Sequence, residues 1–393
     1  MDRRRVLIVG GGIAGLALAP MLARTGVEVE VAERERPWRP AGTGMYLPGN
    51  AARALRALGL EAQVASRAVE IARQRFYDHH GRLLCEVDVA ELWAAVGPCL
   101  AVHRAELHAL LREAAGELPI RIGLAVKRLD QRDGAVSVDF SDGTSGAYDL
   151  VVGADGIHSA VRRLAFKPTA VPRPVGQIGW RFLAPRPPEV TTWSVMLGHG
   201  TAFLTLPIAG DRVYCYCDVV SRPGPDTPEQ VAPERLGELF SEFADPAATL
   251  LAKLDVAADI HVSTIEEVAL DRWGRERVVL IGDAAHATSP NMAQGAAMAL
   301  EDALCSQTAC TRSRRSPTPS RRSRPSAGPE PTGSAPSPTA AITPDICHRR
   351  SGTTSCDSSA GASSTPTTVR SWTNPKPPCQ PRSFGRRRAT SRR

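Results

Sequence analysis

The architecture follows from the stretch Val6-Leu7-Ile8-Val9-Gly10-Gly11-Gly12-Ile13-Ala14-Gly15, which precedes the helix-forming residues 16–24. An apolar run that ends in a glycine-rich turn predicts a buried strand, a tight turn and a helix start. Gly10 permits the turn, Gly12 lets a phosphate approach the backbone, and Gly15 lets helix and strand pack closely. Free N–H groups and the helix dipole favour an anion there, so we expect this turn to bind a diphosphate.

An acidic residue, Glu33, follows the next apolar strand, expected over residues 27–32. Its carboxylate falls at the roughly 20-residue spacing of an acceptor for adenosine ribose hydroxyls. Taken alone, this motif fits NAD or FAD. Ile13 and Ala14 in the turn and Arg34 beside Glu33 complete the predicted dinucleotide site.

The same N-terminus permits a second interpretation, because Arg3-Arg4-Arg5 before an apolar stretch resembles a secretory signal peptide. Glycines interrupt that stretch, and the dinucleotide motif explains the same residues, so we favour nucleotide binding. No run of 18 apolar residues occurs, so no membrane span is expected. The cysteines and histidines lack paired C-x-x-C spacing, so no metal site is indicated.

Two later segments again combine a strand, a turn and a helix start. The apolar run 148–154 ends in Asp155-Gly156 and continues as His158-Ser159-Ala160-Val161-Arg162. The apolar run 278–281 ends in Gly282-Asp283, and the chain then reaches a helix expected to begin near Ala296. Three such turns far apart in one chain together specify FAD.

Over roughly residues 4–304, the three motifs in this order resemble the class A flavoprotein monooxygenases, the aromatic-ring hydroxylases similar to p-hydroxybenzoate, salicylate, 3-hydroxybenzoate and urate hydroxylases. The resemblance implies that Asp283 binds the ribityl chain of FAD and that Arg104, at an Arg-x-x-Leu helix start, contacts FAD. It implies that the Val126 backbone meets the adenine, and that Asp155 and Arg162 serve FAD and NAD(P)H. The implied contacts of the flavin ring edge are Ala293, Gln294, Gly295, Ala296 and Ala297.

Several of these residues also have a structural interpretation. Arg104 could be a solvated helix arginine, and Asp155 and Asp283 could be helix N-caps, a position that favours aspartate on geometric grounds. Capping and ligand binding are compatible. For His286, near a helix start, a satisfied structural role is the default expectation.

The expected fold is α/β, with a Rossmann-like FAD-binding domain (1–71, 99–171 and 273–304) and an interleaved antiparallel-sheet substrate domain (72–98 and 172–272). Alternating strands over 192–197, 202–207 and 212–219 favour such a sheet. Tyr214 and Tyr216 share one face of their strand, and Cys215 and Cys217 share the other. The resemblance makes Tyr214 the candidate catalytic residue, whereas Ala202, where a urate-type enzyme would have arginine, disfavours urate.

The function implied by the resemblance is hydroxylation of a small phenolic substrate. The resemblance implies that NAD(P)H would reduce FAD and that oxygen would be transferred to the ring through a flavin C4a-hydroperoxide formed with O2. Alternatives are epoxidation of an alkene, reduction of a polyprenyl chain, and a non-catalytic flavin binder; a halogenase would show a Trp-x-Trp pair, which is absent. We expect a cytoplasmic monomer or homodimer without nucleic-acid or membrane partners.

From Cys305 the composition changes abruptly. Residues 305–393 contain no leucine, 15 arginines, one lysine and three acidic residues, so their charge is +13 and residues 1–304 carry −6, which together give the net +7. No hydrophobic core can form from this composition, so a disordered tail is expected. The basic pI therefore describes the tail alone.

Two origins of the tail remain open. A natural basic tail could contact nucleic acid or an anionic surface. A frameshift in a GC-rich gene would also convert Ala-, Val-, Gly-, Leu- and Arg-rich helical sequence into Arg, Ser, Pro and Thr, and we favour it because the helical pattern stops after Glu301-Asp302-Ala303-Leu304. The five tail cysteines then have no redox meaning, and the four others suit a reducing cytoplasm.

Overall fold

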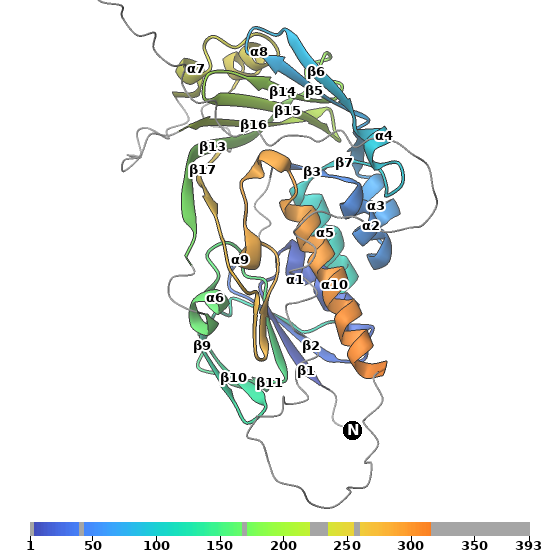
Figure 1. Cartoon of the computed structure of the whole chain (residues 1–393), viewed down its shortest axis with the longest axis vertical. Coiled ribbons are helices and arrows are strands. Elements are labelled where there is room, and N and C mark those ends of the chain that lie inside the picture. Colours follow the sequence, from blue (N-terminus) through green and yellow to red (C-terminus); the bar gives the residue numbers. More distant parts are fainter. Residues whose placement is uncertain (1–3, 39–42, 167–170, 221–234, 255–259, 316–393) are drawn as a thin grey trace, which may run out of the picture. The chain divides into compact units, whose positions relative to one another are not determined.

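The computed structural model describes residues 4–38, 43–166, 171–220, 235–254 and 260–315. Two large sheets dominate this part of the chain (Figure 1). One is a mostly parallel sheet flanked by helices, and the other is a mostly antiparallel sheet that covers one end of it. The mixed α/β fold expected from the sequence is confirmed.

The parallel sheet has six strands in the order β18-β19-β12-β1-β2-β8. Val9 on the central strand β1 pairs with Ala32 on one side and Gly153 on the other. The carboxyl ends of parallel strands meet at one edge, so the glycine turn, Glu33 and Asp155 are brought together there. The strands are β1 (Arg5–Val9), β2 (Glu28–Glu33), β8 (Ile120–Ile122), β12 (Leu150–Gly153), β18 (Gly274–Arg275) and β19 (Val278–Leu280).

Two small antiparallel sheets join this part, in the orders β3-β7-β4 and β11-β10-β9. The run 148–154, expected to be one strand, is divided between β11 and β12. The break falls at Asp149, whose carboxylate accepts a hydrogen bond from the Arg5 N–H at 2.8 Å while its own N–H donates to the Arg5 carbonyl at 2.9 Å. The strands are β3 (Gly44–Leu47), β4 (Ala68–Glu70), β7 (Leu100–His103), β9 (Val126–Arg132), β10 (Ala135–Phe140) and β11 (Ser145–Tyr148).

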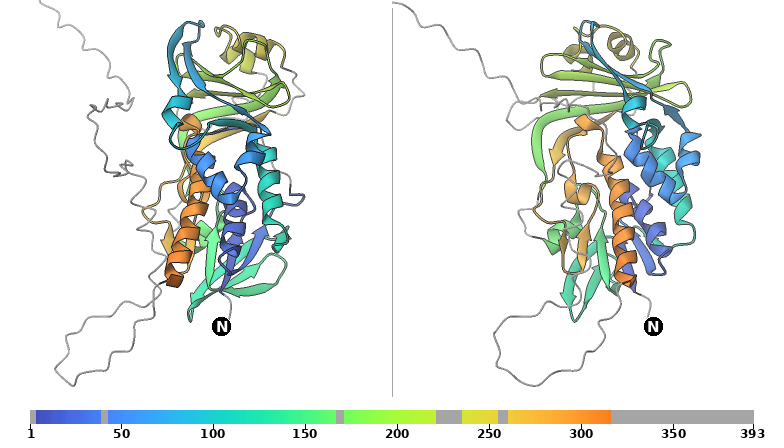
Figure 2. Two further views of the ribbon diagram at one scale, coloured as in Figure 1. Left: turned by 90° about the vertical axis from the view of Figure 1, so that its right-hand side faces the viewer. Right: turned by 45° about the vertical axis from the view of Figure 1, so that its right-hand side comes forward.

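Helix α1 (Ile13–Ala23) is apolar on every side, and it is buried because helices α2, α5 and α10 pack around it (Figure 2). Burying apolar side chains at about 25 cal/mol per Å² is the main force that holds these layers together. The other helices are α2 (Gly49–Leu58), α3 (Glu61–Ala65), α4 (Val89–Trp93), α5 (Arg104–Ala115), α6 (Ala160–Ala165), α7 (Leu236–Leu239), α8 (Ala247–Ala252), α9 (Asp283–His286) and α10 (Gly295–Arg315).

The second large sheet has seven strands in the order β17-β13-β16-β15-β14-β5-β6. Both segments expected to form the substrate domain contribute strands to it, and β14 pairs in parallel with β5 while the other pairs are antiparallel. The domain boundaries themselves stay a prediction. The strands are β5 (Arg73–Asp78), β6 (Leu83–Asp88), β13 (Arg173–Pro185), β14 (Trp193–Leu197), β15 (Thr201–Ile208), β16 (Arg212–Val220) and β17 (His261–Glu267).

Helix α10 continues to Arg315, past Leu304, where the sequence analysis ends the helical pattern. Extending a helix that is already nucleated adds one hydrogen bond per residue, and no proline or glycine interrupts the sequence before Pro317. Ala303 is the last residue of α10 in the described core. The rest of the predicted tail, residues 316–393, lies outside the described residues. Among the helices that are described, none is long and apolar enough to cross a membrane.

Candidate active site

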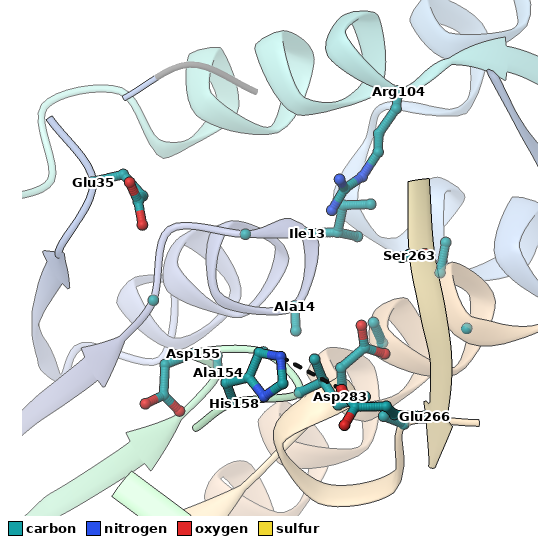
Figure 3. Close-up of a pocket in the computed structure, with 18 of the residues that line it drawn as sticks. Ile13, Ala14, Glu35, Arg104, Ala154, Asp155, His158, Ser263, Glu266 and Asp283 are labelled. Carbon is teal, nitrogen blue, oxygen red and sulfur yellow. Dashed lines mark ion pairs between the residues drawn. The ribbon is translucent and has the colours of Figure 1, made fainter. Parts of the chain in front are cut away.

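A cavity of about 890 Å³ lies between the strand ends of the parallel sheet and the covering antiparallel sheet (Figure 3). All three predicted motifs reach it. The predicted site residues that line it are Gly10, Gly12, Ile13, Ala14, Glu33, Arg34, Arg104, Val126, Asp155, Tyr214, Asp283, Gly295 and Ala296. Segments from widely separated parts of the sequence thus share one cavity.

The glycine-rich turn has a different requirement at each of its glycines. Gly10 has a φ of +110°, and a Cβ there would overlap the Ala154 backbone. A Cβ on Gly15 would overlap the carbonyl oxygen of Gly10, so only glycine lets α1 pack against the turn. Gly12 differs, because among the described residues no atom beyond its two chain neighbours lies within 4 Å of the Cβ position, and Gly12 lines the cavity. The turn therefore leaves room for a ligand at Gly12.

Glu33 is buried at the end of β2, with both carboxylate oxygens hydrogen-bonded to backbone groups. One oxygen accepts from the Gly11 N–H at 2.7 Å, and the other accepts from the Glu35 N–H at 2.7 Å. A carboxylate oxygen has a second lone pair, so each can still accept from a ligand hydroxyl. The bonds fix the orientation of Glu33 toward the cavity.

His108 supports the glycine-rich turn through a hydrogen bond to the Gly11 carbonyl, a role that the sequence analysis missed. Its Nε2 lies 2.8 Å from the Gly11 carbonyl oxygen, and its ring packs edge-on to Trp38 with centroids 5.1 Å apart. Burial lowers the pKa of His108, so the neutral ring donates to this carbonyl. The sequence signal is its place on α5, four residues after Arg104.

Asp155 and Arg162 organise the second motif. The Asp155 carboxylate accepts hydrogen bonds from the Ala160 N–H at 2.6 Å and from the Ser159 hydroxyl at the start of α6. Ser159 itself is the N-cap, because its hydroxyl oxygen accepts from the Arg162 N–H. Asp155 thus satisfies helix-start donors as expected of a capping residue, and it also lines the cavity.

The Arg162 guanidinium is fully buried, and it joins the second motif to the third. It donates to the Ala284 carbonyl at 2.9 Å and to the Ile157 carbonyl. Burial lowers the pKa of Arg162. These contacts support a structural clamp between α6 and α9; contact of Arg162 with FAD or NAD(P)H stays a prediction.

The third motif is held by helix α10. Asp302 on α10 accepts from the Gly282 N–H at 2.8 Å, and the same oxygen lies 2.7 Å from Nε2 of His286. Asp283 begins α9 without capping it and lines the cavity. Burial opposes a charged His286, but the hydrogen bond and ion pair with Asp302 outweigh it and raise the pKa of His286. This geometry favours the structural role for His286.

The His286–Asp302 pair predicts a pH-dependent stability. Because the folded-state pKa of His286 is raised above its unfolded value of about 6.5, the pair contributes fully below that value and its contribution is lost as the pH rises through the folded pKa. His286→Gln is therefore expected to lower the free energy of unfolding most at acidic pH. Urea denaturation of both proteins across a pH series measures the difference, and a difference that grows with pH would contradict it.

Four predicted cofactor residues do not line the cavity. Gly15 serves packing, and Ala297 is fully buried in the core. Ala293 packs under the antiparallel sheet, and the side chain of Gln294 accepts from the Asn50 amide at 3.3 Å. A side-chain contact of Ala297 with a ligand in this cavity is therefore not supported. The start of α10 meets the cavity through Gly295 and Ala296 instead.

Tyr214 lies at the end of the cavity roofed by the antiparallel sheet. Burial raises the pKa of Tyr214, so its phenol stays protonated. A Cβ on Gly44 would overlap the Tyr214 side chain, so glycine on β3 permits this packing. On the other face of β16, Cys215 and Cys217 are fully buried in the core under α7 and α8.

Arg181 and Ser263 line the same end of the cavity, and the sequence analysis missed both. Arg181 lies on β13 opposite Tyr216 on β16 and His261 on β17. Nothing in a single strand pattern reveals this position, because it depends on pairing between strands far apart in the chain.

The residues present fit FAD. An open space at Gly12 fits a diphosphate at a helix start, and Glu33 offers carboxylate oxygens for sugar hydroxyls. The cavity volume lies within the range of cofactor and ligand pockets, about 300–1,000 Å³. Its length from Val126 to Tyr214 spans both parts of the fold. Fold and site together define a flavoprotein with a covered pocket.

Comparison with known proteins gives the family. Residues 3–309 match the FAD binding domain family. The chain is 38% identical over 302 residues to 2-heptyl-3-hydroxy-4(1H)-quinolone synthase of Pseudomonas aeruginosa, covering 76% of this chain and 78% of that protein. It is 34% identical over 320 residues to 3-amino-4-hydroxybenzoate 2-monooxygenase of Streptomyces cremeus, covering 76% of each. Its fold matches Klebsiella pneumoniae HpxO complexed with FAD and uric acid, with a TM-score of 0.70 and 27% identity over 78% of this chain and 79% of that one.

The chain belongs to this family and is a class A FAD-dependent aromatic monooxygenase. The predicted family, cofactor and enzyme class are confirmed. The individual site residues stay predictions.

Proposed function

We propose that this chain hydroxylates a small phenolic aromatic substrate, using NAD(P)H and O2 with FAD. The observation that supports it is the continuity of one cavity from the glycine turn to Tyr214 and Arg181. A cofactor bound along the strand ends would present its reactive ring toward the sheet-covered end. A substrate there would be held between cofactor and sheet.

The names of the relatives favour a substrate ring that carries an oxygen substituent. One relative is a 2-heptyl-3-hydroxy-4(1H)-quinolone synthase and another is a 3-amino-4-hydroxybenzoate 2-monooxygenase. Urate stays disfavoured, because Ala202 on β15 replaces the arginine expected of a urate-type enzyme. Oxygen-substituted rings are electron-rich, and this favours attack by an electrophilic oxygen.

Bound FAD would supply the redox and oxygen-transfer chemistry. The chain's own residues would bind and orient it. The turn at Gly10 and Gly12 would hold the diphosphate, Glu33 the ribose hydroxyls, and Asp283 the polyol chain. Arg104, Arg34 and Val126 line the cavity and complete the proposed cofactor contacts.

At the covered end, the chain would position the substrate and exclude water. Tyr214 remains protonated because burial raises its pKa, so its hydroxyl can donate a hydrogen bond to a substrate oxygen. The seven-stranded sheet covers this end with β13, β16 and β17. Exclusion of water protects reactive intermediates from hydrolysis.

Stimulated cofactor oxidation tests the proposal. With FAD present, a phenolic substrate is expected to accelerate NAD(P)H oxidation and to yield a hydroxylated product, and Tyr214→Phe is expected to lower kcat/KM by about 10- to 100-fold. The measurement is NAD(P)H absorbance with product analysis by mass spectrometry. Benzene derivatives without an oxygen substituent serve as control ligands.

The outcomes separate the alternatives. Epoxide formation from an alkene, or reduction of a polyprenyl chain, would replace the hydroxylase proposal. An NAD(P)H oxidation rate that no ligand changes would indicate a non-catalytic flavin binder.

We further propose a cytoplasmic location. All described cysteines are free, namely Cys85, Cys99, Cys215, Cys217 and Cys305. Reduced cysteines are typical of that compartment. A monomer or homodimer stays the expectation.

A further inference from the structure

Arg181 is a positive charge on the roof of the substrate end of the cavity. It lies in the middle of β13, with β16 and β17 hydrogen-bonded on either side, so its backbone is fixed by two neighbouring strands. Its side chain lines the cavity together with Tyr214 and Ser263. A side chain on a strand that is paired on both sides is held in place more precisely than a side chain on a loop.

Two contacts hold the guanidinium in place. Nη1 donates to the Ser263 hydroxyl at 2.7 Å, and the guanidinium carbon lies 5.1 Å from the centroid of the Tyr216 ring. A stacked and hydrogen-bonded arginine has already lost much of its rotamer freedom, so binding a ligand orders little more. Its planar array of donors suits a carboxylate or another anionic oxygen.

The charge of Arg181 is not balanced by a close carboxylate. Within the described ranges, no Asp or Glu oxygen lies within 4.0 Å of its nitrogens. Asp218 on β16 lies two residues beyond Tyr216 on the same face of the strand, and it is buried; burial raises the pKa of its carboxyl, while the charge of Arg181 acts in the opposite direction. On β17, the strand beside Arg181, the Glu266 carboxylate is 3.5 Å from Nε2 of His158 (Figure 3). A half-buried cation without a close anion is stabilised when an anionic ligand binds.

We propose that Arg181 is the specificity-determining residue that binds an ionised oxygen of the aromatic substrate, either a carboxylate or a phenolate. The inference deepens the proposed function and rests on it for the nature of the ring. Tyr214 donates to the same substrate end, and Arg181 supplies the charge. The substrate class is thus an aromatic acid or an acidic phenol in its anionic form.

Ligand binding to the full chain in the presence of saturating FAD and in the absence of NAD(P)H tests this inference. Benzoate and its neutral isostere benzamide probe a carboxylate. The probes 4-nitrophenol and 4-nitroanisole test a phenolate, and the absorbance of bound 4-nitrophenol reports its ionisation. In the wild-type protein, at least one anionic probe is expected to bind about 10- to 100-fold more tightly than its neutral partner.

Arg181→Gln is expected to abolish this preference, and Arg181→Lys to retain part of it. Arg186→Gln is the matched control, because Arg186 follows the same strand but pairs with Asp211 outside the cavity. Flavin content and melting temperature establish that each variant is folded. If Arg181→Gln does not fold, the test uses Arg181→Lys together with the preference of the wild-type protein for the anionic probe over its neutral partner.

The inference is overturned if neither acid binds the wild-type protein, if acid and neutral probes bind equally, or if Arg181→Gln keeps the preference. Its failure is distinct from failure of the proposed function. If anions bind through Arg181 but no ligand stimulates NAD(P)H oxidation, the proposed hydroxylase function is contradicted and the inference about Arg181 stands. If neutral aromatic rings are hydroxylated and Arg181→Gln does not change the rate, the inference about Arg181 is contradicted and the proposed hydroxylase function stands.

Discussion

Gly12→Ala is expected to leave the folded chain nearly as stable as before without FAD, and to weaken FAD binding by at least about 100-fold. In the described part of the chain, no atom beyond the two neighbouring residues lies within 4 Å of a Cβ at this position, and the backbone there is extended with φ −81° and ψ −171°, which alanine adopts readily. The loss of glycine at a helix N-cap costs stability, and the reduced freedom of the unfolded chain offsets it, so the net change stays within about 1 kcal/mol. The proposed diphosphate, however, needs the space that the new methyl group fills.

Gly15→Ala provides the contrast on the same helix. Its Cβ would overlap the Gly10 carbonyl oxygen, a backbone atom that cannot rotate away. Strain of this kind typically costs about 1–3 kcal/mol or more, so this variant is expected to lose both stability and FAD. Equilibrium urea unfolding of the FAD-free proteins, together with FAD titration by fluorescence quenching, separates the two effects. If Gly12→Ala binds FAD as well as the wild type, the proposed place of the diphosphate is wrong.

The parts of the fold that follow local rules could be predicted from the sequence. The apolar run before Gly10 predicts a strand, and the glycines after it predict a turn and a helix start. Glu33 marks the end of the next strand. These predictions succeed because each signal lies within one element. The strand that the sequence predicts over 148–154 is too long, since it is interrupted at Asp149, whose hydrogen bonds go to Arg5, far away in the chain. The end that the sequence predicts for α10 comes too early, because the composition changes before the helix ends at Arg315.

The site shows the same division. A sequence motif marks Gly12, Glu33 and Asp283, and all three line the cavity, while their contacts with a cofactor stay predictions. Arg181 carries no motif, and its meaning arises only when β13 lies between β16 and β17. Arg162 likewise looks like any helix arginine until α9 packs against α6 and buries it. Long-range packing therefore sets the roles that sequence patterns leave open.

The chain as written is expected to hold FAD weakly and to unfold at low temperature or without cooperativity. Its core on α10 ends at Ala303, and the tail after Cys305 has no leucine with which to add an apolar layer. In the family that this sequence resembles, the chain continues beyond this point with further C-terminal helices. At about 25 cal/mol per Å², a few hundred Å² of apolar surface left in water removes several kcal/mol, and whole domains are stable by only about 5–15 kcal/mol.

The coding DNA around the Leu304 codon tests the cause. If a frameshift produced the tail, the alternative frame after this codon is expected to encode an Ala-, Leu- and Arg-rich helical end. A chain with that end is expected to melt cooperatively, at a temperature several degrees higher than the original chain, and to retain more flavin. One kcal/mol corresponds to roughly 2–4 °C in a protein of 150–250 residues, so a gain of several kcal/mol is readily measured by thermal denaturation. A chain cut after Arg315, the last described residue of α10, is the matched control, because it lacks both tails. A purified original chain that is yellow with stoichiometric flavin and melts cooperatively would show that this fold needs no further helical layer, since residues 4–315 would then bury enough apolar surface alone.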